Sequence, residues 1–312
     1  MTTQKIHAVT GAFGYTGKYI AKQLLADGRR VITLTNNPQR ANPFGTQVKA
    51  IPFNFADPAA LAASLAGVDT LYNTYWVRFD HGRASFTQAV ANTRTLVQAA
   101  VQAGVRRFVH ISITNPDPQS SLGYFRGKGQ LEQAIQSSGI SYAILRPAVI
   151  FGQEDILINN IAWLLRRFPL FAIPGDGKYR LQPIYVEDLA ALAVQAGAAH
   201  ENQIIQAIGP ETFTFNDLVG MLAAVVGSRA RLVHLPPSLA YWLSKLVGVV
   251  VGDVILTREE VLGLMDNLLV AEAPPAGHTR LSESAAQNSA TLGTRYAHEI
   301  KRHYKLKGIP AA

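Results

Sequence analysis

Tyr124 and Lys128 are the residues whose types and spacing most directly suggest proton-transfer chemistry. Residues four positions apart lie on one face of an α-helix, so their side chains can meet. A lysine ammonium beside a phenol favours the phenolate and lowers the pKa of a tyrosine, which can then exchange the proton of an alcohol. The alternative is an ordinary exposed pair on a helix surface, which the spacing alone would favour.

A glycine-rich turn supplies the second chemical motif. Gly11, Gly14 and Gly17 form the pattern G-x-x-G-x-x-G after an apolar run at 6–9 and before a helical pattern at 15–26. The first glycine permits a tight turn, the second a close approach to a pyrophosphate, and the third close packing of helix on strand. The start of the helix offers N–H groups and positive potential to phosphates. We predict a dinucleotide-binding loop made of Gly11, Phe13, Gly14, Tyr15, Thr16 and Gly17, against the alternative of an ordinary glycine-rich turn.

The segment after the second predicted strand, 31–34, bears on the choice of dinucleotide. An acidic residue there binds the ribose 2′-hydroxyl of NAD, and the stretch LTNNPQR contains none. Asn36 and Arg40 could instead hold a 2′-phosphate. We therefore predict NADP as the cofactor, with NAD possible, although Arg40 could equally be a solvated loop residue.

Alternating apolar runs and helical patterns must position these motifs. Strands are predicted at 6–9, 31–34, 48–55, 70–73, 108–111 and 142–145, and helices at 15–26, 59–65, 86–103 and 130–137. Strands that are apolar throughout indicate a parallel sheet covered on both faces. We predict an α/β fold with a doubly wound parallel sheet of the Rossmann type in residues 1–150, a sheet that could recruit a strand from 203–208.

The second half follows a different pattern. Helices are predicted at 156–168, 186–196, 215–226 and 239–250, a turn at 173–177, and a loop at 273–289, which is rich in Pro, Ser and Ala. This pattern predicts a smaller, helix-rich lobe over residues 151–312 that serves a substrate or a partner.

Composition excludes several classes of protein. The 312 residues are 48% hydrophobic and 16% charged, as in globular proteins, and the lack of cysteine excludes disulfides and thiolate chemistry. No H-x-x-x-H pair occurs, so we predict no metal site. The start MTTQKIHAVTG lacks a secretory pattern, and Lys245 and Asp253 interrupt the most apolar stretch. We therefore expect a cytoplasmic protein without an integral membrane segment.

Charge is unevenly distributed along the chain. Residues 1–150 hold 15 Lys and Arg against 6 Asp and Glu, so this half carries the whole excess of the net charge of +8. A positive field would suit an anionic ligand such as a dinucleotide, while a simple solubility charge is the alternative. The basic residues are scattered and no aromatic and basic cluster occurs, so we expect no nucleic acid partner.

Five motifs together resemble the short-chain dehydrogenase/reductase superfamily over about residues 5–195. They are TGAFGYTG, HISIT, YFRGK, LRPAVIFG and PIYVEDLA. Within it, the likeness is to the extended or atypical branch with an NmrA-like domain. The segments LTREEVLGLMDN and LGTRYAHEIKRHY are similar to bacterial relatives of the 39-kDa accessory subunit of respiratory complex I.

The resemblance implies catalytic roles. Tyr124 would exchange the substrate proton, and Lys128 would also bind the ribose hydroxyls. The superfamily places a serine or threonine near the end of the fifth strand to hold a substrate carbonyl. Here Ile113 occupies the usual position, so Ser112 or Thr114 would have to substitute.

The resemblance also implies cofactor contacts. Asn54 and Phe55 would touch the adenine, with an amide where an acid is often found. Pro147 and Val149 would run beside the nicotinamide. Gly127 and Gly129 should weaken the helix that presents the catalytic tyrosine, by about 1 kcal/mol each relative to alanine.

Three functions remain open at this point. The first is an NAD(P)-dependent oxidoreductase acting on a carbonyl or alcohol of an unidentified small molecule, favoured by Tyr124 and Lys128. The second is a non-catalytic NAD(P)H-binding regulator or assembly protein, favoured by Ile113 and the C-terminal likeness. The third is a nucleotide-sugar epimerase or dehydratase, disfavoured by the short span from Ser112 to Tyr124. Self-association into a homo-oligomer is also left open.

Overall fold

The computed structural model describes residues 5–80 and 84–300, and the chain divides into two compact units. The first unit comprises Met1–Pro147 and Val186–Ala207, and the second comprises Ala148–Tyr185 and Ile208–Ala312. These units differ from the predicted segments 1–150 and 151–312 in two places: residues 148–150 belong to the second unit, and the stretch 186–207 returns to the first.

The first unit contains a seven-stranded parallel sheet in the order β11-β6-β5-β4-β1-β2-β3. Its strands are β1 (Ile6–Thr10), β2 (Arg30–Thr35), β3 (Val48–Pro52), β4 (Val68–Asn73), β5 (Arg107–Ile111), β6 (Ser141–Pro147) and β11 (Gln203–Ala207). The predicted doubly wound fold is confirmed, and the 203–208 segment does join the sheet. The strand order reverses between β1 and β4, where ligands bind in folds of this type.

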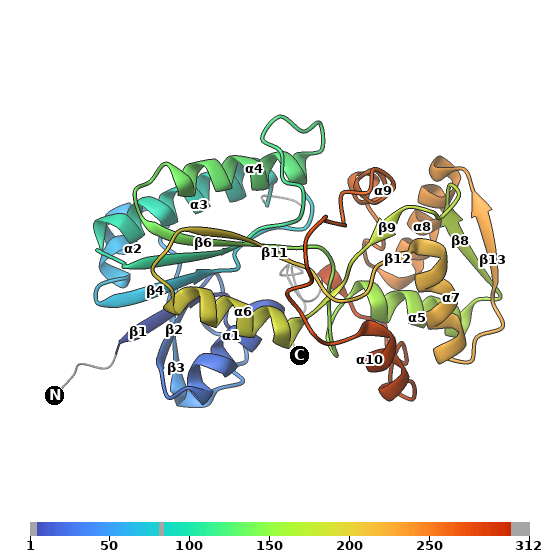
Figure 1. Cartoon of the computed structure of the whole chain (residues 1–312), viewed down its shortest axis with the longest axis horizontal. Helices are drawn as coiled ribbons and strands as arrows, with labels where there is room; N and C mark the ends of the chain where they lie inside the picture. The colour runs from blue at the N-terminus through green and yellow to red at the C-terminus, as the bar shows by residue number, and fades with distance from the viewer. Residues whose placement is uncertain (1–4, 81–83, 301–312) are drawn as a thin grey trace. The chain divides into compact units, whose positions relative to one another are not determined.

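Helices cover both faces of this sheet. In Figure 1, α2, α3 and α4 lie on one face, and α1 and α6 lie on the other. Their bounds are α1 (Tyr15–Ala26), α2 (Pro58–Ser64), α3 (Phe86–Gln102), α4 (Gly123–Gln136) and α6 (Val186–Ala198). Every residue of β5 is buried, including Arg107 and His110, as expected for a strand covered on both faces.

Two element boundaries in the first unit differ from expectation. Helix α4 begins at Gly123, so the helix predicted over 130–137 extends further toward the N-terminus and includes both Tyr124 and Lys128. Strand β3 ends at Pro52 rather than at Phe55. Proline has no N–H to donate to a neighbouring strand, which favours an ending there.

The second unit has its own apolar core. Its elements are β7 (Ile150–Phe151), α5 (Leu157–Arg167), β8 (Leu170–Pro174), β9 (Arg180–Leu181), β10 (Ile184–Tyr185), β12 (Phe213–Thr214), α7 (Phe215–Val225), β13 (Arg231–Leu235), α8 (Pro237–Val251), α9 (Arg258–Met265) and α10 (Leu281–Gln287). The prediction of a loop over 273–289 is wrong in its second half, because α10 buries Leu281 and Ala285 in this core.

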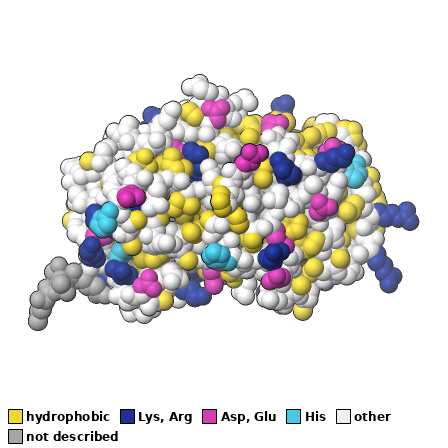
Figure 2. Space-filling view, in the orientation of Figure 1, with side chains coloured by type: hydrophobic (Ala, Val, Ile, Leu, Met, Phe, Trp, Pro, Cys, Tyr) yellow, Lys and Arg dark blue, Asp and Glu magenta, His cyan; other side chains and the backbone are white. Residues whose placement is uncertain are grey.

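The described residues also show whether a helix could span a membrane, whether side chains are grouped as a metal site, and how charges are distributed on one face (Figure 2). Among residues 5–80 and 84–300, no helix is both long and apolar enough to cross a bilayer. The same residues contain no group of three or more His, Asp or Glu side chains arranged to hold a metal ion. On the face drawn in Figure 2, basic and acidic side chains are interspersed among apolar ones.

Candidate dinucleotide and proton-transfer site

The glycine loop joins β1 to α1 at the point where the strand order reverses. Gly11 has φ +64°, a left-handed backbone conformation that side chains disfavour. The N–H of Gly14 donates to the carbonyl of Gly11 at 2.8 Å, which closes the turn. A Cβ on Gly17 would lie only 2.4 Å from the same carbonyl oxygen. Two of the three glycines are therefore required by the fold of the turn itself.

Strand β2 anchors this loop from the side. The hydroxyl of Thr33 accepts the N–H of Ala12 at 2.9 Å and donates to the carbonyl of Val9 at 2.8 Å. The N–H of Gly11 also donates to the carbonyl of Leu34 at 2.8 Å. These bonds tie the loop to Thr33 and Leu34 of β2 and to Val9 of β1, so the path of the loop does not depend on its own side chains.

The start of α1 suits an anion. Gly14 is the residue that precedes the helix, so no side chain caps it, and the first turn carries no acidic residue. The side chain of Phe13 is buried, so a contact from this residue to a phosphate would come from its backbone. Tyr15 and Thr16 are half-buried at the helix start, where the helix dipole attracts negative charge. These features fit the phosphates of a dinucleotide.

The turn after β2 carries the residues predicted to choose the cofactor. Asn36 is exposed and Arg40 is half-buried. The N–H of Asn37 donates to the hydroxyl of Thr35, and that of Arg40 donates to the carbonyl of Asn37, each at 3.1 Å. No acidic residue lies in this turn, so a 2′-phosphate would meet no like charge from it.

Three aromatic rings form a wall where β3 and β4 end. Phe53 and Phe55 stack with centroids 4.6 Å apart, and Tyr75 lies 5.3 Å and 5.4 Å from them. The hydroxyl of Tyr75 accepts from the amide of Asn92 at 2.8 Å. Burial raises the pKa of Tyr75, so its ring stays neutral. Neutral aromatic rings suit a planar base, and Asn54, which separates the two phenylalanines in the sequence, is half-buried.

A chain of buried polar side chains links the ends of β1, β4 and β5, and the sequence pattern did not single it out. The hydroxyl of Thr10 donates to the amide oxygen of Asn73 at 3.1 Å and accepts the N–H of Thr74 at 2.7 Å. The amide nitrogen of Asn73 lies 3.0 Å from Nδ1 of His110. Thr10 and Asn73 end their strands, Thr74 follows one and His110 stands one before the end of its strand, which is the signal that could have revealed them.

His110 is held neutral by its surroundings. Its side chain is fully buried, and burial together with the nearby charge of Lys128 holds the pKa of His110 well below its usual value. A neutral ring whose Nδ1 accepts from Asn73 carries its proton on Nε2. That Nε2 has no hydrogen-bond partner in the described structure.

Tyr124 and Lys128 come together on the first turns of α4, beside the end of β5. The ammonium of Lys128 donates to the carbonyl of Ile111 at 2.8 Å and lies 4.6 Å from the ring centre of Trp76. Lys128 is only 3% exposed, and burial lowers its pKa to about 7, partly opposed by Glu132. This lysine is therefore poised between its charged and neutral forms near neutral pH.

Aromatic rings enclose the same corner. Tyr124 lies edge-on to Trp76 and to Phe86, with centroids 5.7 Å and 5.8 Å away. A Cβ on Gly127 would lie 2.7 Å from the Trp76 ring, and a Cβ on Gly129 would lie 2.4 Å from the nitrogen of Pro118. The two glycines do not simply weaken α4, as we expected from their propensities. They allow close packing against the helix that a larger residue would prevent.

Ser112 and Thr114, the candidates for holding a substrate carbonyl, have different hydrogen-bond partners. The hydroxyl of Ser112 donates to the carboxylate of Glu132 at 2.5 Å, and Glu132 also pairs with Arg146. The N–H of Thr114 donates to the carbonyl of Pro147 at 2.9 Å. Because its proton is engaged by a buried carboxylate, Ser112 has a structural partner in addition to its predicted catalytic role.

The predicted nicotinamide contacts fall in different units. Pro147 ends β6 in the first unit, whereas Val149 is buried in the core of the second unit. The structure thus gathers the glycine loop, the aromatic wall and the Tyr124–Lys128 corner within one unit.

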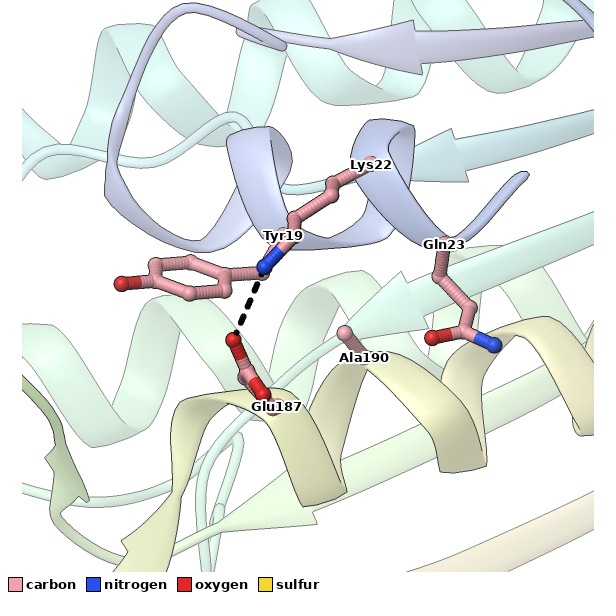
Figure 3. A pocket seen from close by; sticks show the side chains of 5 residues that line it. All are labelled: Tyr19, Lys22, Gln23, Glu187 and Ala190. Carbon is pink, nitrogen blue, oxygen red and sulfur yellow. Dashed lines mark hydrogen bonds and ion pairs between the residues drawn. The ribbon is translucent and has the colours of Figure 1, made fainter. Parts of the chain in front are cut away.

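A small hollow lies between α1 and α6 of the first unit (Figure 3). Figure 3 shows Lys22 of α1 reaching toward Glu187 of α6, with their charged atoms 3.2 Å apart. Its volume is about 50 Å³, far below the 300–1,000 Å³ or so of small-molecule sites. The hollow is lined by Tyr19, Lys22, Gln23, Glu187 and Ala190. It cannot hold a dinucleotide.

A family of known proteins matches the part of the chain that holds the glycine loop. Residues 11–158 match the family described as NAD(P)H-binding. The chain therefore carries an NAD(P)H-binding domain.

Curated relatives confirm the likeness seen in the sequence motifs. The chain is 25% identical over 243 residues to the complex I protein "NADH dehydrogenase [ubiquinone] 1 alpha subcomplex subunit 9, mitochondrial" of Arabidopsis thaliana. This match covers 74% of the chain and 60% of that protein's length. It is 28% identical over 235 residues to the (4-alkanoyl-5-oxo-2,5-dihydrofuran-3-yl)methyl phosphate reductase of Streptomyces griseus, covering 73% and 76%.

A solved structure shows the same fold. The triphenylmethane reductase of Citrobacter sp. superposes with a TM-score of 0.75 at 21% identity, covering 92% of this chain and 99% of that one. The same reductase is also known in complex with NADP(H). At this level of identity the match supports the fold alone.

Proposed function

We propose that this protein is an NADP(H)-dependent oxidoreductase of the short-chain dehydrogenase/reductase type, in the extended NmrA-like branch, that acts on a carbonyl or alcohol of a small molecule. The observation that carries the proposal is the contact of both Tyr124 and Lys128 with the Trp76 ring, in the unit that holds the glycine loop. A phenol and a lysine with a pKa near neutral thus share one corner.

The residues present fit a dinucleotide. The uncapped start of α1 would hold the pyrophosphate, and the stacked Phe53 and Phe55 would hold the adenine. Arg40 would hold a 2′-phosphate, because its turn contains no acidic residue. When bound, such a cofactor supplies or accepts a hydride at its nicotinamide ring.

The protein's own part in the reaction is proton exchange. Tyr124 would give its phenolic proton to the substrate oxygen, and Lys128 would stabilise the phenolate that remains. The carbonyl of Ile111 holds the lysine in place at 2.8 Å. Thr114 or a water molecule would hold the substrate oxygen, because Ser112 donates its proton to Glu132.

A non-catalytic NAD(P)H-binding role is the second candidate. It is favoured by the engagement of Ser112 by Glu132 and by the nearly complete burial of Lys128. The similarity to a complex I subunit points the same way.

A cytoplasmic location stays a prediction, and the Arabidopsis relative is described as mitochondrial.

Reductase assays with Tyr124→Phe test the proposal. We expect the wild type to oxidise NADPH with at least one member of a panel of aldehydes, ketones and quinones. Loss of the transferable proton should lower turnover about 10²–10⁴-fold while cofactor affinity, measured by calorimetry, stays within about twofold.

Tyr142→Phe provides the matched control. Tyr142 is half-buried on β6 and packs against the core, away from the α4 corner, so its substitution should leave turnover unchanged. Robust wild-type turnover that survives Tyr124→Phe would refute the assigned mechanism. Tight NADPH binding without turnover on the whole panel would favour the non-catalytic role.

A further inference from the structure

Helix α8 of the second unit presents its large apolar side chains to solvent. The exposed fractions are 63% for Leu246 and 83% for both Val249 and Val250. Leu239, Trp242 and Leu243 are 46%, 61% and 39% exposed. Monomeric soluble proteins rarely expose contiguous apolar patches of this kind without a use for them.

The exposed residues form one stripe. They recur at intervals of three and four along α8, which places them on a single face of the helix. The opposite face holds the small residues Ala240 and Gly248, the only fully buried positions of the helix. A surface helix normally buries its large apolar side chains, whereas α8 exposes them and buries two small residues.

Close packing accounts for the small residues of the inner face. A Cβ on Gly248 would lie 2.7 Å from the carbonyl of Asp253, whose N–H donates to the carbonyl of Gly248. Figure 1 shows α8 beside β8 and β13. The inner face of α8 thus packs within the second unit, and the exposed stripe is the face that could contact another molecule.

Helix α8 itself carries charge of one sign. Its 15 residues include Lys245 and no Asp or Glu. The ammonium of Lys245 lies 4.9 Å from the Tyr241 ring centre and 5.1 Å from that of Trp242. Apolar side chains flanked by tyrosine, tryptophan and lysine are typical of helices that lie in a membrane interface.

We propose that α8 docks this protein on an anionic lipid surface, with the stripe from Leu239 to Val250 inserted among the acyl chains and Lys245 at the headgroups. The helix has 15 residues and would span about 22 Å, which is too short to cross a bilayer of about 30 Å. It would therefore lie in the plane of the interface. A helix with one basic and no acidic side chain of its own complements anionic headgroups.

Vesicle sedimentation with the full chain tests this docking. The wild type should sediment with vesicles of phosphatidylcholine and phosphatidylglycerol more than with phosphatidylcholine alone. The double variant L246E/V250E should lower the partition coefficient at least about 100-fold, since burial of each side chain contributes about tenfold or more. A blue shift of tryptophan emission should accompany binding and be lost in Trp242→Phe.

Val101→Glu is the matched control, because Val101 is 46% exposed on α3 of the first unit. It should sediment like the wild type. Wild-type protein that stays in the supernatant would overturn the proposal, as would equal binding to both kinds of vesicle. A dimer that L246E/V250E dissociates, without vesicle binding, would assign the stripe to a second copy of the chain instead. Measurement of mass by light scattering separates these outcomes.

Discussion

The glycine loop and the Tyr124–Lys128 corner lie in the same unit but are built in different ways. The loop is held by backbone hydrogen bonds and by the hydroxyl of Thr33, and its shape depends on glycines at Gly11 and Gly17. The corner is held by side chains, with a buried ammonium against the Trp76 ring. Backbone geometry therefore fixes the loop, whereas side-chain packing fixes the corner.

This difference shows where function can change without loss of the fold. A backbone cradle binds phosphate through N–H groups, which every residue type except proline supplies. A packed corner depends on the side chains of Trp76, α3 and α4, so a substitution there can change the corner while the glycine loop keeps its shape.

The largest effect is expected from Gly17→Val. The new Cβ would lie 2.4 Å from the carbonyl of Gly11, so the loop or the helix must shift. We expect the free energy of unfolding to fall by about 3 kcal/mol or more, as for severe overpacking, and dinucleotide binding to be lost. Urea denaturation and calorimetry would measure the two effects.

Gly220→Ala is the control for this substitution. Gly220 lies within α7, and a Cβ there would meet nothing within 4 Å. Alanine should raise the free energy of unfolding by about 0.5–1 kcal/mol. If Gly17→Val left the free energy of unfolding and dinucleotide binding unchanged, the shape of the loop would not depend on Gly17.

The next effect concerns Lys128 and pH. Burial lowers the pKa of Lys128 from 10.5 to about 7, so the unfolded chain binds more protons between these values. Stability contributed by this residue therefore rises with pH across that window, by up to about 1.4 kcal/mol per pH unit. Relative to Lys128→Met, the wild type should gain free energy of unfolding from about pH 7 toward pH 9.

Urea denaturation at several pH values would measure this slope. Lys49→Met is the matched control, since Lys49 is exposed on β3 and should show no such slope relative to the wild type. A flat difference between the wild type and Lys128→Met would mean that the ammonium is solvated in solution, and the packed corner would then be open.

The smallest effect is expected from Arg40→Ala, beside the loop. If Arg40 holds a 2′-phosphate, its loss should weaken NADPH binding about 10- to 100-fold and leave NADH binding nearly unchanged, because a hydrogen bond to a charged group contributes about 1.5–3 kcal/mol. Calorimetric titration with both cofactors would measure the ratio. Equal losses would make Arg40 a surface charge and leave NAD as an equal candidate.

Much of the first unit could be predicted from local patterns. The predicted bounds of α1 agree with the structure, and β2 and β4 differ by one or two residues at their ends. The missed elements are those without a clear period. Helix α10 is short, and its apolar residues are spaced among Ser and Glu, so its helical state depends on the burial of Leu281 and Ala285.

The sequence by itself determined the glycine loop and the doubly wound sheet, because a tight turn, a helix start and apolar periodicity are properties of neighbouring residues. The tertiary structure decided what each polar side chain meets. Lys128 binds a carbonyl 17 residues away, and Ser112 donates to Glu132 rather than standing free. Such contacts depend on how α4 packs on the sheet, and the spacing of Tyr124 and Lys128 cannot encode the ring of Trp76 that lies against both.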